Sequence, residues 1–207
     1  MERLVRARLL PAELTEEDVR RHPGREFASR EIGAWCIHGP SHGGKGCTPD
    51  VLAAVTHSLC DIYRHICTQT EVGLQVNLHL DYEDARVRVA SSRDERRGEV
   101  SVRVKQPCDV LIRVPQWAPE DSVHVTVHGE EITAERLGMF AWVRGDILRD
   151  SGEVVMSYDL PERETEEQMP SGRCYRFRWR GDEITGVTPQ DEPLSFYPAI
   201  RETTDAG

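Results

Sequence analysis

The sequence predicts a mainly β protein, an antiparallel β-sandwich of jelly-roll type that follows a short helical segment. Two observations predict this fold class. From about residue 73 onward, apolar and polar residues alternate in short runs, and turn-forming residues separate these runs. Before that point the apolar residues recur at spacings of three and four, which is typical of helices. We therefore expect a helical and loop segment at 1–72, a β-sandwich domain at 73–200 and a frayed tail at 201–207.

The composition indicates a globular chain that binds neither nucleic acid nor membranes. Hydrophobic residues make up 38% and charged residues 30% of the 207 residues. The net charge of −10 disfavours contact with phosphate backbones. No apolar run approaches the roughly 20 residues that a membrane span needs. The first residues, Met1 to Arg6, are too charged for a secretory signal, so we expect a cytoplasmic location with reduced cysteines.

Two helices are expected in the first 72 residues. The shorter one follows Thr15, which can cap it, and ends before Pro23. The longer one begins after Thr48, with Pro49 at its first position. Its apolar residues form a continuous stripe: Leu52, Val55, Leu59, Ile62 and Ile66. We expect this stripe to rest on the β domain or on a partner, because the residues before it are too few and too polar to cover it.

The strands of the sandwich are predicted from the alternation of apolar and polar residues. Clear runs lie at 74–80, 87–89, 100–104, 110–114 and 123–127, and further strands are expected at 139–143, 153–158 and 175–179. In the first run Gln75, Asn77 and His79 form the polar face. The acidic segment Glu162–Glu167 is expected to be a solvated loop. Short strands in this number, separated by turns, are typical of an antiparallel sandwich.

A cluster of thiols and imidazoles lies in and next to the glycine-rich stretch 33–46. Cys36, His38, His42 and Cys47 follow one another with the spacing C-x-H-x3-H-x4-C. Thiolate and imidazole are the usual zinc ligands, and four of them can complete a tetrahedral structural site. The spacing matches no standard zinc finger, and loops also collect such residues by chance. Zinc binding by these four residues and an ordinary loop both stay open as interpretations.

Tryptophans in the β region are candidates for carbohydrate contact. Trp117, Trp142 and Trp179 could stack on the C–H faces of a sugar ring, and we select Trp117 and Trp142 as the contact residues. Trp117 follows Pro115, and Trp142 lies within an apolar strand, so packing between the sheets is the alternative role.

Six phrases follow one another along the chain. They are GCT at 46–48, LQVNLHL at 74–80, LIRVPQWA at 111–118, the strand and turn 123–129, GMFAWV at 138–143 and YDLP at 158–161. This order, over roughly residues 33–198, is similar to the closing part of glycoside hydrolase family 127, the β-L-arabinofuranosidase-like proteins. In that family an α/α barrel carries the active site, and β-sandwich material follows it. The resemblance implies that the long helix is one of the last barrel helices and that most of the barrel has no counterpart here.

The resemblance also implies a catalytic site that this sequence matches only in part. Family members carry adjacent cysteines in a GCCT setting before that helix. One thiolate is the nucleophile, which attacks the anomeric carbon with retention, and the other helps to hold a zinc ion with an upstream glutamate and cysteine. Here Gly46 stands at the nucleophile position and Cys47 at the zinc-ligand position. A shift of one residue would make Cys47 the catalytic nucleophile but would put the start of the helix out of register.

Two functions from different classes follow. The first is the C-terminal portion of a β-L-arabinofuranosidase-like glycoside hydrolase without independent catalysis, which acts with a separately encoded or lost barrel. The second is a free-standing, non-catalytic β-sandwich module that binds a carbohydrate or a protein partner. The expected partners are an L-arabinofuranoside-type carbohydrate and either a second copy of the chain or a separate barrel subunit. Apart from zinc, no cofactor is expected.

Overall fold

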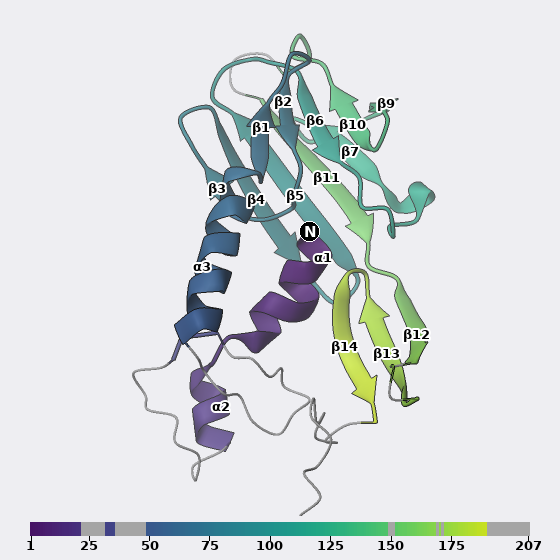
Figure 1. Cartoon of the computed structure of the whole chain (residues 1–207). Coiled ribbons are helices and arrows are strands. Elements are labelled where there is room, and N and C mark those ends of the chain that lie inside the picture. Colours follow the sequence, from purple (N-terminus) through teal and green to yellow (C-terminus); the bar gives the residue numbers. More distant parts are fainter. Residues whose placement is uncertain (22–31, 36–48, 149–151, 169, 171, 190–207) are drawn as a thin grey trace, which may run out of the picture.

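The structure is a computed structural model, and it describes residues 1–21, 32–35, 49–148, 152–168, 170 and 172–189. Most of these residues form an antiparallel β-sandwich, which confirms the predicted fold class. Helices and a small third sheet lie together at one end of the sandwich (Figure 1). Strand β1 (Cys67–Gln69) comes before residue 72, and the division of the chain at that residue stays a prediction.

Within the described residues the strands form three sheets. The five-stranded sheet has the order β1, β2 (Leu74–Val76), β6 (Val110–Arg113), β10 (Phe140–Val143) and β9 (Glu135–Leu137). The six-stranded sheet has the order β3 (Tyr82–Glu83), β4 (Val87–Arg93), β5 (Arg97–Val104), β11 (Glu153–Asp159), β7 (His124–Val127) and β8 (Glu130–Ile132). The third sheet contains β12 (Glu162–Gln168), β13 (Cys174–Arg180) and β14 (Glu183–Thr188). Among these pairs β2 and β6 run parallel, whereas the other pairs are antiparallel.

The main core lies between the five-stranded and six-stranded sheets and consists largely of valines. On β4 and β5 the buried valines alternate with more exposed residues, and Val89 pairs with Val102 across the two strands. From the opposite sheet, Val110 and Ile112 of β6 enter the same cluster and are fully buried. Each such side chain contributes roughly 1.5–3 kcal/mol when it leaves water. The alternation of apolar and polar residues that predicts the strands therefore also supplies the side chains that pack between the two sheets.

Gly98 of β5 allows a large aromatic ring to enter this core. It is the cross-strand partner of Tyr158 on β11, and the Tyr158 side chain is fully buried. A Cβ atom on Gly98 would overlap the Tyr158 ring. We therefore expect Gly98→Ala to lower the free energy of unfolding by roughly 1–3 kcal/mol, the usual cost of overpacking. Urea unfolding measures this, with Glu99→Ala, an exposed neighbour, as the control; equal stability of the two variants would contradict the packing argument.

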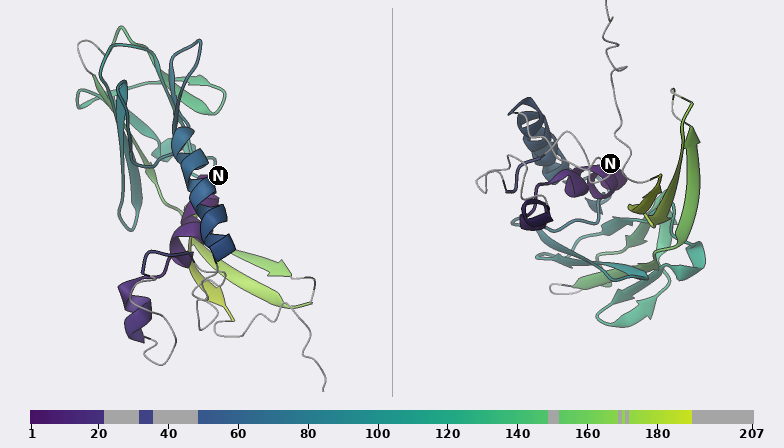
Figure 2. Two further views of the ribbon diagram at one scale, coloured as in Figure 1. Left: turned by 60° about the vertical axis from the view of Figure 1, so that its left-hand side comes forward. Right: turned by 90° about the horizontal axis from the view of Figure 1, so that it is seen from below.

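The N-terminal turns and α3 lie side by side at the end of the sandwich, with the N-terminal turns between α3 and β14 (Figures 1 and 2). The helical elements are α1 (Glu2–Leu4), η1 (Val5–Leu9), η2 (Leu10–Ala12), α2 (Glu16–Arg21) and α3 (Pro49–Arg64). A small second core joins them: Val5, Ile62, Ile66 and Leu78 are buried in it, and Leu9 and Leu59 pack on its margin. The C-terminal end of the predicted stripe, at Leu59, Ile62 and Ile66, is thus covered by the chain's own N-terminal turns and by the segment after β2, whereas Val55 belongs to neither core. None of the described helices has the length and apolar character needed to cross a membrane.

The long helix is shorter than the predicted stripe, which ended at Ile66. α3 ends at Arg64, and the next two N–H groups bond to carbonyls three residues back in a tighter turn. The carbonyl of Ile66 then accepts the N–H of Asn77 at 2.8 Å. The chain has therefore already joined the five-stranded sheet at Ile66, and β1 follows directly.

The acidic segment Glu162–Glu167 is part of the strand β12, so the prediction of a loop is wrong, whereas its glutamates are exposed to solvent as expected. The glutamates of β12 stand opposite arginines of β13: Glu162 opposite Arg180, Glu164 opposite Arg178 and Glu166 opposite Arg176. Cross-strand pairs of opposite charge stabilise a sheet by roughly 0.2–1 kcal/mol each. The alternate residues Arg163 and Thr165 contact Trp179. The acidic run is therefore one half of a pairing pattern whose other half lies on β13.

Candidate ligand pocket

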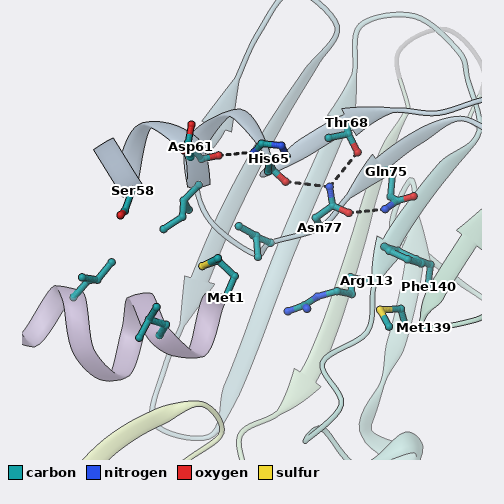
Figure 3. A pocket seen from close by; sticks show the side chains of 14 residues that line it. Met1, Ser58, Asp61, His65, Thr68, Gln75, Asn77, Arg113, Met139 and Phe140 are labelled. Carbon is teal, nitrogen blue, oxygen red and sulfur yellow. Dashed lines mark hydrogen bonds between the residues drawn. The ribbon is translucent and has the colours of Figure 1, made fainter. Parts of the chain in front are cut away.

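A pocket of about 1010 Å³ lies between the helices and the outer face of the five-stranded sheet (Figure 3). Its walls come from the N-terminal turns, the second half of α3, the strands β1 and β2 with the residues after β2, and the facing ends of β6 and β10. Ligand pockets in proteins typically measure roughly 300–1,000 Å³. The space is therefore large enough for a small-molecule ligand.

One wall of the pocket carries a chain of hydrogen bonds centred on Asn77 (Figure 3). Its amide nitrogen donates to the carbonyl of His65 at 3.0 Å and to Thr68 Oγ1 at 3.1 Å, and its Oδ1 accepts from Gln75 Nε2 at 2.6 Å. Within the described residues, the hydroxyl hydrogen of Thr68 and the amide oxygen of Gln75 form no hydrogen bond. The wall is thus held in place by its own bonds and still offers a donor and an acceptor.

The end of α3 adds His65 and Asp61 to this wall. His65 Nδ1 lies 2.7 Å from the carbonyl oxygen of Asp61, and because a carbonyl only accepts, Nδ1 carries the proton. Nε2 of the neutral ring can therefore accept a hydrogen bond from a ligand. The Asp61 carboxylate lies 3.6 Å from the Arg64 guanidinium, which offsets its charge, and 3.2 Å from His57 Nε2.

The neighbouring wall, which continues along the same outer face of the sheet from β2 to β6 and β10, is apolar apart from Arg113. Phe140 and Arg113 are cross-strand partners on β10 and β6, so both side chains leave the outer face of the sheet next to each other. Figure 3 shows the guanidinium group of Arg113 pointing toward Met1, with Met139 and Phe140 beside it. Met1 and Met139 are 66% and 48% exposed. The apolar wall is therefore open to solvent at its margin.

A buried cluster of charges around Glu2 lies next to this wall. Three guanidinium groups surround the Glu2 carboxylate: Arg93 at 3.1 Å, Arg6 at 3.4 Å and Arg113 at 3.6 Å. The carboxylate also accepts the backbone N–H of His79 at 3.2 Å, and Arg93 pairs in addition with the buried Asp182. Burial by itself would raise the pKa of Glu2, but His79, Arg6 and Arg93 outweigh it and lower that pKa. Glu2 is therefore an ionised anchor that ties the N-terminal turns to the sheets.

His79 is fixed as a neutral imidazole beside this cluster. Its Nε2 donates to the carbonyl of Arg113 at 2.8 Å, so Nδ1 is the acceptor and takes the hydroxyl hydrogen of Tyr158 at 2.7 Å. Burial lowers the pKa of His79 from its ordinary value near 6.5 to about 4, against an opposing effect of Glu2. Burial also raises the pKa of Tyr158 to about 12. The pair therefore stays neutral over the physiological pH range.

The sequence pattern did not identify Glu2, His79 or Arg113 as residues of a site. His79 was expected on the polar face of a strand over 74–80, and this is wrong because β2 ends at Val76 and the chain then turns so that His79 is only 1% exposed. A signal was present in two places. Glu2 and Arg6 have the spacing of a helical ion pair, and Arg113 interrupts an apolar strand.

The residues predicted to hold zinc or to act as nucleophile lie outside the described residues. They are Cys36, His38, His42 and Cys47, together with Gly46 at the expected nucleophile position. Among the residues that the structure does describe, no group of three or more His, Cys, Asp or Glu side chains could hold a metal ion. Zinc binding by the four residues stays a prediction.

The two tryptophans predicted to contact carbohydrate lie in different surroundings. Trp142 shares the outer face of β10 with Phe140, and its Nε1 donates to Asp109 Oδ2 at 2.9 Å. Trp117 packs against the core and meets the Tyr158 ring edge-on, with centroids 5.6 Å apart. The aromatic residue that lines the pocket is Phe140. Trp142 thus lies along the same face as the pocket, whereas the contacts of Trp117 favour a packing role.

Comparisons with known proteins give structural similarity only. No family model and no curated protein matches the chain. Among solved structures it is similar to a family 127 β-L-arabinofuranosidase from Geobacillus stearothermophilus T6, with 18% identity and a TM-score of 0.49 over 84% of this chain and 28% of the enzyme. It is also similar to a second glycoside hydrolase, with 17% identity and a TM-score of 0.46 over 78% of this chain and 28% of that protein. The chain thus spans about 28% of the length of either structure, and the family indicated by the sequence phrases is the one named for the first.

Proposed function

We propose that the chain is a glycoside-hydrolase-related fragment, the C-terminal portion of a β-L-arabinofuranosidase-like enzyme, which binds carbohydrate and has no catalytic activity of its own. The observation that carries the proposal is the mixed lining of the pocket, in which hydrogen-bonding side chains lie next to Phe140 on the same face of the sheet. A sugar ring has hydroxyl groups around its edge and C–H groups on its faces, so a ring stacked on Phe140 can turn its edge toward these side chains. The order of the six sequence phrases supports the same family context.

The chemistry of the pocket supports binding rather than hydrolysis. Glycoside hydrolysis by two carboxyl groups needs a second one within roughly 5–9.5 Å of the first. Among the described residues that line the pocket, Asp61 is the one carboxylate, and it is engaged with His57 and Arg64. The alternative route needs a thiolate nucleophile, and Gly46 stands at that position in the sequence.

The remaining expectations belong to the same proposal. A zinc ion held by Cys36, His38, His42 and Cys47 would have a structural role in this chain. The location would be cytoplasmic, and the partner would be a second copy of the chain or a separate barrel subunit. Trp142 would extend the contact with a longer saccharide beyond Phe140, because both side chains lie on the same face of β10.

The purified chain is expected to bind methyl β-L-arabinofuranoside but not to hydrolyse p-nitrophenyl β-L-arabinofuranoside, with or without added zinc. An NMR titration measures the binding, and release of nitrophenol measures turnover. Phe140→Ala is expected to weaken binding about three- to tenfold, because an aromatic stacking contact contributes roughly 0.5–1.5 kcal/mol. Ile147→Ala is the matched control, since Ile147 is also apolar and 43% exposed but does not line the pocket.

Two outcomes would overturn parts of this proposal. Zinc-dependent turnover that Cys47→Ser abolishes would make Cys47 a catalytic nucleophile and would contradict the non-catalytic assignment. A titration in which no pocket resonance shifts, or in which Phe140→Ala and Ile147→Ala bind the sugar equally well, would remove the pocket as the carbohydrate site.

A free-standing binding module is the second candidate function, and the covering of α3 favours it. A helix taken from the end of a barrel would leave its apolar stripe without neighbours. In the described part of this chain Ile62 and Ile66 are buried against Val5 and Leu78. Sedimentation at increasing protein concentration tests the fragment whose partner is a second copy, because that fragment is expected to associate whereas a free-standing module is expected to stay monomeric.

A further inference from the structure

We propose that the pocket selects an acidic saccharide, whose carboxylate pairs with Arg113 while its ring stacks on Phe140. The inference rests on the proposed carbohydrate function of this pocket and adds the chemical class of the ligand. Uronic acids are the matching class, because they combine a sugar ring with one carboxylate.

The buried charge cluster holds one more positive than negative group. Its cations are Arg6, Arg93 and Arg113, and its anions are Glu2 and Asp182, so three positive charges face two negative ones. The neighbouring His79 is 1% exposed, with its ring nitrogens bonded to the Tyr158 hydroxyl and the Arg113 carbonyl, and burial keeps it neutral, so it adds no charge. Asp94 and Glu95 line a different hollow with Arg6 and Arg93, and neither forms an ion pair with them in the described structure. One guanidinium charge is therefore not balanced within the cluster.

Arg113 is the arginine of this cluster that is available to bind a further anion. Its contact with Glu2 is the longest of the three, at 3.6 Å, and its side chain is 31% exposed, compared with 17% for Arg6 and 12% for Arg93. Of these three arginines it is also the one that lines the pocket. A guanidinium group has five N–H donors, so one long contact with Glu2 leaves donors for a second carboxylate.

The surroundings of Arg113 fix where such a ligand would lie. The Arg113 carbonyl accepts a hydrogen bond from His79, and its strand pairs with the strand of Phe140, so the side chain starts from a rigid position. A sugar ring on Phe140 would have its carboxylate beside the guanidinium and its hydroxyl groups toward Gln75 and Thr68, which lie on neighbouring strands of the same sheet (Figure 3). The negative Asp61 on α3 is countered by Arg64, at 3.6 Å, and does not cancel the attraction of Arg113.

A titration with D-galacturonate and D-galactose, which differ at C6 in carboxylate versus hydroxymethyl, tests the inference. The wild-type chain is expected to bind galacturonate about tenfold more tightly than galactose at low ionic strength, with a smaller difference at high salt. Arg113→Gln is expected to abolish this preference and to change galactose binding less than about threefold, while Arg113→Lys keeps part of it. Arg88→Gln, which removes an exposed arginine outside the pocket, is expected to leave both affinities unchanged.

The outcomes separate this inference from the proposed function. Equal affinities of the wild-type chain for the two sugars would overturn the role of Arg113 and leave the carbohydrate pocket standing. Binding of neither these sugars nor methyl β-L-arabinofuranoside would overturn both. Since Arg113 also contacts Glu2, thermal unfolding of each variant accompanies the titration; if Arg113→Gln does not fold, the comparison of the two sugars on the wild-type chain decides.

Discussion

Glu2→Gln is expected to lower the free energy of unfolding by about 3–5 kcal/mol, the usual cost of removing one partner from a buried ion pair. The substitution keeps the shape of the side chain but leaves two largely buried guanidinium groups, Arg6 and Arg93, short of a counter-charge. In the wild-type chain the backbone N–H of His79 donates to the Glu2 carboxylate, and the substitution also weakens this hydrogen bond between the first helical turn and the segment after β2. Urea unfolding near neutral pH measures the change.

The pH dependence distinguishes a charge effect from a packing effect at Glu2. Because the folded-state pKa of Glu2 is lowered, its contribution to stability is complete above the ordinary carboxyl pKa of 4.5 and is lost as the pH falls through the lowered value. The stability gap between wild type and Glu2→Gln should therefore narrow on acidification below that range. Glu135→Gln on the exposed strand β9 is the control and is expected to change stability by less than about 0.5 kcal/mol. A gap that stays constant with pH would contradict the electrostatic account.

The sandwich could be predicted because its strands repeat one simple pattern. Valines at alternate positions of β4 and β5 are buried and their neighbours are not, so the periodicity in the sequence is also the burial pattern in the fold. The strands that were not predicted are short or carry little apolar alternation, such as β3 and β9. β12 shows the physical reason most clearly. Its glutamates are stabilised by arginines on β13, and a pattern read along one strand does not include the charges of its partner.

The pocket was harder to predict because its walls come from segments far apart in the chain. Met1, His65, Arg113 and Phe140 all line it, although they come from four separate segments of the chain. The N-terminal stretch is polar enough to suggest an exposed end, yet Val5 and Leu9 suffice to cover the end of α3. The predicted carbohydrate contact Trp142 lies on β10, and the aromatic residue of that strand that lines the pocket is Phe140; the contact itself stays a prediction. The alternation of apolar and polar residues predicts which side chains share a face of a strand. Which of them borders a cavity depends on where the neighbouring helix packs on that face.

The protonation of His79 alone is expected to lower the free energy of unfolding by about 3 kcal/mol as the pH is lowered from 6.5 to about 4. Burial lowers the folded-state pKa of His79 to about 4, whereas the unfolded chain takes up the proton near 6.5. Between these values the unfolded state binds more protons, so acidification favours unfolding. Above 6.5 the contribution of His79 is complete, and below about 4 it changes no further.

His79→Gln tests this assignment by removing the titration while keeping a polar side chain. Its unfolding free energy is expected to be roughly 1–3 kcal/mol lower at neutral pH, because the Tyr158 hydroxyl loses its acceptor inside the core. Its stability should then vary much less than that of the wild type between pH 6.5 and about 4. His57→Gln, at an exposed histidine of α3, is expected to keep the wild-type slope. If both variants kept that slope, a group other than His79 would have to take up the proton, and the neutral imidazole between Tyr158 and Arg113 would not be the origin of the acid sensitivity.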